Sequence, residues 1–163
     1  DRAPPTSGNA YAGESETREG WTLCQKRGNA LPQSHPTRHT CTTMRTYPLT
    51  AAIADHELID LGDPAGLGGD VLSGTPRISA RVDFQDGGMM AGIFEATTGT
   101  VRIHFPFTEH ATILEGEVTI TDEDGRAHTY RPGDSYLIHQ GQVVLWEVAG
   151  PRVRKSFFNL ARN

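Results

Sequence analysis

An arginine, a histidine and a glutamate, Arg102, His104 and Glu109, lie close together in the sequence. Arg102 and His104 are two residues apart, so on a β-strand they point to the same face, either a solvated face or the lining of a polar cavity. Pro106 has no N–H to donate to a sheet, so the strand bends or stops there, and we expect Glu109 to face the pair across the bend. Glu109 then has one of two roles. It forms a satisfied ion pair, or its carboxylate and the imidazole of His104 are placed around a small molecule.

A second group of side chains has the chemistry of zinc ligands. It consists of Cys24, His35, His39 and Cys41. Pro36 breaks any helix that would align the two histidines, and no strand or knuckle pattern flanks the cysteines. We therefore favour incidental residues over a zinc site.

Short β-strands must position the candidate residues, and the sequence predicts about nine of them, rich in β-branched and aromatic residues and separated by Gly, Asp and Pro. They are residues 76–84, 89–96, 100–105, 110–115, 117–121, 127–131, 135–139, 142–148 and 153–160. The sequence has no helical pattern longer than about two turns, so these strands indicate a β-sandwich or a closed β-barrel. Asp124-Gly125 is the clearest hairpin turn, whereas residues 60–74 contain too many glycines for a regular helix or strand.

Residues 1–43 differ in composition from the rest of the chain. They contain scattered Pro, Ser and Thr without an apolar period, which predicts a disordered or non-native extension, with residues 44–163 as the domain and its barrel at about residues 76–160. Both cysteines lie in the extension, so the barrel suits a reducing cytoplasm. The net charge of −5 and the scattered basic residues argue against nucleic acid. No apolar run of about 18 residues indicates a membrane span.

The order of residues 99–148 resembles the cupin superfamily, and within it the small cupins related to (S)-ureidoglycine aminohydrolase and the ethanolamine-utilisation cupin. In the first cupin motif, a His-x-His pair is followed by a Glu and a Gly. Glu109 and Gly116 match that Glu and Gly, His104 matches the second His, and Arg102 stands in place of the first. For Arg102 and His104, the resemblance therefore favours the lining of a polar cavity over a solvated face. The resemblance implies an all-β cupin barrel, that is, a double-stranded β-helix or jelly roll.

The second motif departs further from the family pattern. Gly133 and Gly141 match, but His139 replaces a Pro and Val144 stands where a metal-binding His belongs. The alignment also turns Trp146 toward the barrel interior, as a core aromatic or as a pocket wall with one N–H donor. His139 follows a strand near a barrel mouth, where it is a surface residue or contacts a ligand.

The family holds its metal with three histidines and one glutamate, and here only His104 and Glu109 remain. Two ligands bind a divalent ion weakly, and Arg102 would add a permanent cation beside it. The resemblance therefore implies at most a divalent metal ion with an incomplete ligand set. A third ligand would have to come from His139 or from His110, which, as the neighbour of Glu109, is expected on the exterior.

Three functions are compatible with these residues. The first is a small-molecule-binding cupin whose pocket takes a small carboxylate- or nitrogen-containing metabolite, with Arg102, His139 and Trp146 binding it and His104 and Glu109 transferring protons. The second is a metal-dependent hydrolase or isomerase of the ureidoglycine aminohydrolase type. The third is a non-enzymatic ligand-sensing or accessory cupin. In each case we expect a homodimer, for which an outer face of Val101, Ile103 and Phe105 could serve.

Overall fold

The computed structural model describes residues 44–49 and 52–162. These belong to the second of two compact units of the chain, Pro36–Asn163. The proposed extension and the four candidate zinc ligands lie outside the described residues, so the domain boundary at residue 44 stays a prediction. Within the described ranges, no helix has the length and apolar character needed to cross a membrane.

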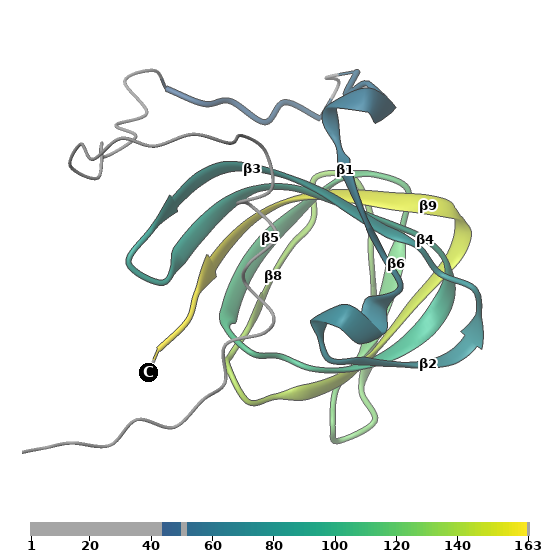
Figure 1. Ribbon diagram of the computed structural model, residues 1–163. Helices are drawn as coiled ribbons and strands as arrows, with labels where there is room; N and C mark the ends of the chain where they lie inside the picture. Colours follow the sequence, from purple (N-terminus) through teal and green to yellow (C-terminus); the bar gives the residue numbers. More distant parts are fainter. Residues whose placement is uncertain (1–43, 50–51, 163) are drawn as a thin grey trace, which may run out of the picture. The chain divides into compact units, whose positions relative to one another are not determined.

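Nine antiparallel strands form one sheet that curls into the predicted all-β barrel (Figure 1). They are β1 (Ile59–Gly62), β2 (Gly69–Gly74), β3 (Ile78–Asp86), β4 (Met89–His104), β5 (Thr108–Glu115), β6 (Val118–Thr121), β7 (Ala127–Tyr130), β8 (Ser135–Ile138) and β9 (Val143–Leu160). Two short 3-10 helices, η2 (Asp55–Glu57) and η3 (Pro64–Leu67), precede β1 and β2. The main path through the sheet is β1-β3-β4-β9-β5-β8, with β2 on β4 and the β6–β7 hairpin on β9.

β4 and β9 are each a single long strand where the sequence predicted two. They pair along their length, from Met89 opposite Leu160 to His104 opposite Val143, with one register shift between Thr97 and Gly99. The glycine therefore bends the ladder without ending it, because the neighbouring strand continues to satisfy the backbone hydrogen bonds on both sides. β4 stops at His104, before Pro106, as predicted.

The prediction of irregular structure for residues 60–74 is wrong, and strand pairing begins at Ile59 rather than at about Pro76. β2 pairs with the second half of β4, placing Asp70 opposite Arg102. Gly69 shows how a glycine-rich segment can pair: a Cβ there would lie 2.7 Å from a Val101 methyl. The glycine permits a close approach, and the edge of β4 provides the hydrogen-bond partners that local propensity does not predict.

Arg154, on the outer side of β9, anchors the segment before β1. Its side chain is only 3% exposed and pairs with Glu95 of β4 at 2.5 Å. It also donates to the carbonyl oxygen of Ile53 at 2.6 Å and to the carboxylate of Asp55. These contacts hold residues 53–55 against the outer face of the barrel and leave the interior to a separate set of side chains.

Asp55 makes this anchoring dependent on pH. The hydrogen bond from Arg154, followed by its charge, holds the pKa of Asp55 below the usual value. A depressed folded-state pKa contributes stability above the ordinary carboxyl pKa and loses it as the pH falls through the folded value. We expect Asp55→Asn to unfold more easily than the parent near neutral pH, with the difference vanishing in strong acid, in denaturant titrations at several pH values. Asp124→Asn, which removes an exposed ion pair, is the control. If the free energies of unfolding of Asp55→Asn and the parent changed with pH in the same way, the proposed dependence on Asp55 would be contradicted.

Candidate functional site

Three polar side chains from adjacent strands meet inside the barrel: Glu109 of β5, Tyr136 of β8 and Lys155 of β9. We call them the interior cluster. The Lys155 ammonium lies 2.5 Å from Oε1 of Glu109 and 2.8 Å from the Tyr136 hydroxyl. The Tyr136 hydroxyl donates to the same Glu109 oxygen at 2.8 Å. The three residues are only 3 to 6% exposed, so the charges face each other in a medium of low polarity.

Aromatic rings surround the Lys155 ammonium. Its Nζ lies 4.8 Å from the centre of the Phe94 ring and 5.4 Å from those of Tyr136 and Trp146. The negative faces of such rings attract a cation and replace part of the hydration that burial removes. The cluster is thus a buried cation held by one carboxylate and an aromatic wall.

The remaining polar contact comes from Asn159 of β9, which is 6% exposed. In the amide orientation that satisfies both of its polar atoms, Asn159 donates to Oε2 of Glu109 at 3.1 Å. Both oxygens of Glu109 therefore have donors, as a buried carboxylate requires.

The hydroxyl of Tyr136 stays protonated at neutral pH. Burial raises the pKa of Tyr136 well above its usual value, and the charge and hydrogen bond of Glu109 raise it further. Because the hydroxyl keeps its proton, it accepts from Lys155 and donates to Glu109. The three groups form a directed chain along which a proton can move.

The indole N–H of Trp146 is buried and makes no hydrogen bond among the described residues. Its interaction with the Tyr136 hydroxyl lowers the pKa of Tyr136, in opposition to the larger effects, although the two groups do not have the geometry of a full hydrogen bond. A buried donor without an acceptor costs about 1 to 3 kcal/mol. An acceptor atom of a ligand beside the cluster would remove that cost.

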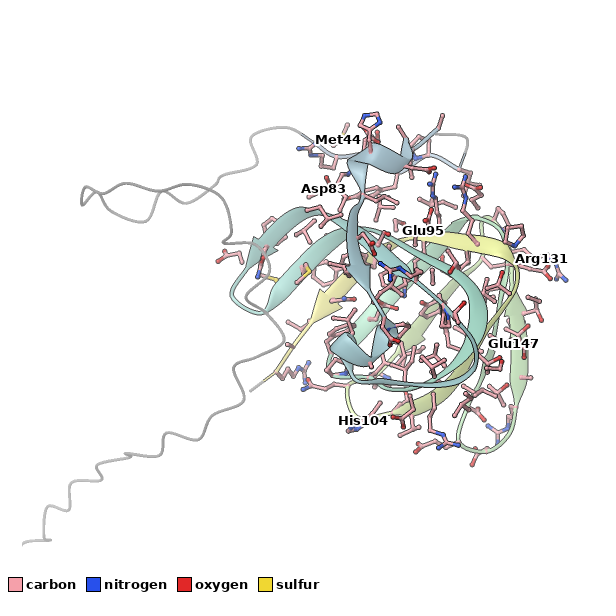
Figure 2. All side chains as sticks on the ribbon, turned by 45° about the vertical axis from the view of Figure 1, so that its right-hand side comes forward. Met44, Asp83, Glu95, His104, Arg131 and Glu147 are labelled. Carbon is pink, nitrogen blue, oxygen red and sulfur yellow. The ribbon has the colours of Figure 1, made fainter. Side chains whose placement is uncertain are left out.

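Arg102 and His104 do not line the interior. Both are exposed, and Figure 2 places His104 at the lower edge of the barrel. Val101 is 4% exposed and lies opposite Trp146 in the β4–β9 ladder, so the apolar face of this stretch points inward. The interior placement favoured by the resemblance is wrong and the solvated face is observed, because burying the apolar side chains of this strand stabilises the fold more than burying an arginine and a histidine would.

The other predicted residues divide between the interior and the surface. Glu109 is interior, but its partners are Lys155 and Tyr136 in place of Arg102 and His104. Trp146 is 4% exposed and in the core, as predicted.

His110 is exposed, as predicted, and so is His139. The expected outer face of Val101, Ile103 and Phe105 is wrong, because these residues pack in or against the core. A homodimer remains a prediction.

Lys155 and Tyr136 are not among the site residues predicted from the sequence. Lys155 carries a signal in composition: the chain has fifteen Lys and Arg residues, and only Lys26 and Lys155 are lysines. A lysine is therefore unusual among the basic residues of this chain, most of which are arginine. Its partner Glu109 lies 46 residues away, so no local pattern joins them.

The metal ion of the resembling family does not fit these residues. Among the described residues, Glu109 is the buried carboxylate of the interior, and its oxygen already contacts an ammonium. Val144, at the expected histidine position, is 4% exposed and apolar, and His104 points outward. The described part of the chain has no group of three His, Cys, Asp or Glu side chains that could hold a metal.

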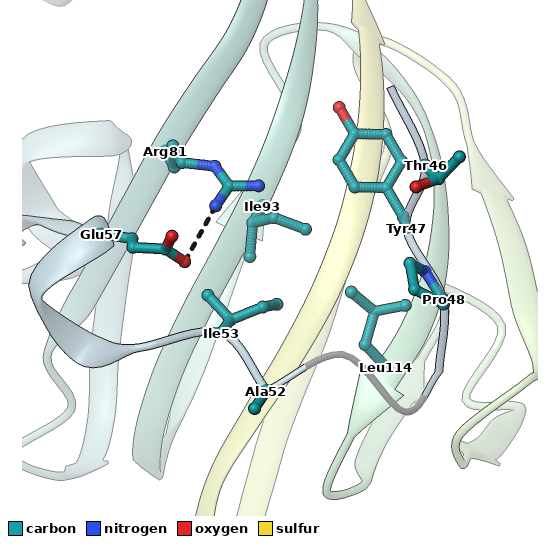
Figure 3. Close-up of a pocket in the computed structure, with 9 residues that line it drawn as sticks. All are labelled: Thr46, Tyr47, Pro48, Ala52, Ile53, Glu57, Arg81, Ile93 and Leu114. Carbon is teal, nitrogen blue, oxygen red and sulfur yellow. Dashed lines mark hydrogen bonds and ion pairs between the residues drawn. The ribbon is translucent and has the colours of Figure 1, made fainter. Parts of the chain in front are cut away.

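A pocket of about 110 Å³ lies on the outer face, under the segment before β1 (Figure 3). The lining of this pocket includes none of the residues of the interior cluster. One of its lining residues is Tyr47, whose pKa is raised to about 12 by burial and by the nearby carboxylate of Asp83. The full lining of the pocket is Thr46, Tyr47, Pro48, Ala52, Ile53, Glu57, Arg81, Ile93 and Leu114.

Comparisons with known proteins match the barrel. The EutQ-like cupin domain family matches residues 84–157. A DUF861-family protein of unknown function from Pseudomonas syringae pv. tomato str. DC3000 is 21% identical at a TM-score of 0.57, over 68% of this chain and 45% of that one. EutQ from Clostridium difficile is 15% identical at a TM-score of 0.51, over 68% of this chain and 81% of that one.

A DUF861-family protein from Thermotoga maritima is 32% identical over 42% of this chain and 75% of that one, at a TM-score of 0.38. No curated protein is similar enough to count as a match. At their identities, the Pseudomonas and Clostridium structures show the fold alone.

Proposed function

We propose that this chain, whose residues 84–157 match the EutQ-like cupin domain family, is a cupin that binds a small oxygen-bearing metabolite inside its barrel, at the interior cluster and without a metal ion. The observation that carries the proposal is the buried N–H of Trp146, which makes no full hydrogen bond among the described residues and belongs to the aromatic wall around Lys155. Together with the Lys155 ammonium, this donor favours an oxygen of a carboxylate or a carbonyl group. The aromatic wall would contact the apolar part of the ligand.

The metal-dependent hydrolase or isomerase is the less favoured alternative. It needs imidazole ligands around Glu109, and that position is occupied by an ammonium. A non-enzymatic ligand-sensing or accessory role is compatible with the same binding site. Binding, rather than turnover, is therefore the activity that the geometry supports, and fold alone does not identify the ligand.

The test is calorimetric titration of the full chain with a panel of small carboxylates, aldehydes and ketones, in the presence of a chelator. For the compound that binds, we expect Trp146→Phe to raise Kd about tenfold, because it removes one hydrogen-bond donor and keeps an aromatic ring. Arg102→Ala, on the outer face, should leave Kd unchanged.

The opposite pattern, with Arg102→Ala weakening binding and Trp146→Phe not, would place the ligand outside the barrel and overturn the proposal. Binding that appears only when Mn²⁺ or Zn²⁺ is added would favour the metal-dependent alternative.

A further inference from the structure

Lys155 is the single lysine among the described residues, and it lies inside the barrel. Arginine, which supplies the other Arg and Lys charges of this part of the chain, does not give up its proton in proteins, whereas a lysine amine can. A desolvated lysine beside a proton acceptor is the usual form of an amine nucleophile. The chain therefore places its one reactive amine of this region where water is scarce.

The neighbours of Lys155 supply the proton acceptor and donor that amine chemistry needs. Oε1 of Glu109, 2.5 Å from Nζ, is placed to take a proton from the ammonium. The Tyr136 hydroxyl, 2.8 Å from Nζ, is placed to protonate an oxygen that develops next to the amine. The N–H of Trp146, which makes no full hydrogen bond among the described residues, can donate to that oxygen as well. Two donors directed at a developing alkoxide stabilise it more than the starting carbonyl.

We propose that Lys155 forms an imine with a small aldehyde or ketone bound in the barrel. The inference rests on the proposed function, since it takes the bound metabolite to be a carbonyl compound. The aromatic wall of Phe94, Tyr136 and Trp146 selects a small apolar substituent and limits the water that would hydrolyse the imine.

The step balances within the cluster. The ammonium of Lys155 gives one proton to Glu109, and the free amine attacks the carbonyl carbon, so that the C–N bond forms as the carbonyl π pair moves to oxygen. That oxygen takes the Tyr136 proton, and Tyr136 regains one from the nitrogen. The protonated Glu109 then donates to the hydroxyl group, the C–O bond breaks, and water leaves. The net reaction converts an ammonium and a carbonyl into an iminium ion and water.

The experiment is reductive trapping on the full chain. Protein is incubated with propanal or with pyruvate and sodium cyanoborohydride, followed by intact-mass measurement and peptide mapping. Reduction of an imine adds the mass of the carbonyl compound less one oxygen atom. Lys26→Arg serves as the parent, which leaves Lys155 and the α-amino group as the primary amines. We expect Lys155 to be labelled at least about tenfold faster than the α-amino group.

Two variants separate a positioned amine from an incidental one. Glu109→Gln should slow labelling of Lys155 by about a hundredfold and leave the α-amino group unchanged. Lys155→Arg, which keeps the cation, should abolish the internal label. In denaturant, the rate advantage of Lys155 over the α-amino group should disappear, which shows that the fold creates it. Circular dichroism spectra establish that both variants are folded before labelling.

The possible results distinguish this inference from the proposed function. Carbonyl compounds or carboxylates that bind by calorimetry without labelling Lys155 would overturn the imine and leave the binding site standing. Neither binding nor labelling would overturn both. Labelling of Lys155 no faster than the α-amino group, and insensitive to Glu109→Gln, would also reject the imine, because the cluster would then contribute nothing to the reaction.

Discussion

Replacing Lys155 with methionine is expected to lower the free energy of unfolding by about 3 to 5 kcal/mol, because it leaves the carboxylate of Glu109 buried without its counter-charge. Glu109 is 3% exposed and would keep only the neutral donors Tyr136 and Asn159. Urea denaturation at neutral pH measures the loss. Methionine keeps an unbranched side chain of similar length, so the change tests the charge more than the packing.

The double variant Lys155→Met/Glu109→Gln is the informative partner of that experiment. It removes both charges, and we expect it to be clearly more stable than the sum of the two single changes predicts. As a control, Arg126→Met removes an exposed pair with Asp124 and should cost less than about 1 kcal/mol. Additive losses at Lys155 and Glu109 would show that the two charges are not coupled in solution.

Gly116→Ala is expected to destabilise the barrel by roughly 3 kcal/mol or more, from backbone strain and steric overlap together. Gly116 follows β5 and has a φ of +74°, a conformation that residues with a Cβ rarely adopt. A Cβ there would lie 2.1 Å from the carbonyl oxygen of Arg152, a backbone atom that a rotamer change cannot move. Thermal or urea unfolding of the variant provides the measurement.

Gly125→Ala is the matched control for Gly116. Its φ of +78° is nearly the same, but a Cβ there would meet nothing within 4 Å. We expect a cost of about 1 to 2 kcal/mol from the backbone conformation alone. The difference between the two variants then measures the overlap with Arg152. Equal costs would mean that the turn moves away from β9 and that close approach is not the reason for the glycine in the first cupin motif.

Several features of the fold follow from local sequence alone. β-branched and aromatic runs separated by glycines predicted the strands after Ile78, and the missing N–H of Pro106 predicted the end of β4. The hairpin at Asp124-Gly125 forms between β6 and β7 as expected, although its loop runs from Asp122 to Arg126. These features depend on backbone preferences of neighbouring residues, which the sequence displays directly.

Which face of a strand becomes the interior was decided by the tertiary structure. The alternation of side chains along a strand showed that Arg102 and His104 share a face. The same pattern does not say whether that face points inward or outward until the strand pairs with its neighbours. β4 pairs with β9 so that Val101 lies opposite Trp146, and the apolar side of β4 therefore points inward. The motif alignment pointed the other way because it counts positions in the chain and does not register the packing of the apolar face.

For this protein, the sequence by itself determined an all-β barrel of the cupin type and a set of polar residues around Glu109. Only the tertiary structure decided which of them meet. Arg102 and His104, near Glu109 in the chain, lie outside the barrel, while Lys155, 46 residues away, lies against its carboxylate. The physical reason is that strand register brings distant residues into contact, and a buried carboxylate is stable only beside whichever donors that register supplies.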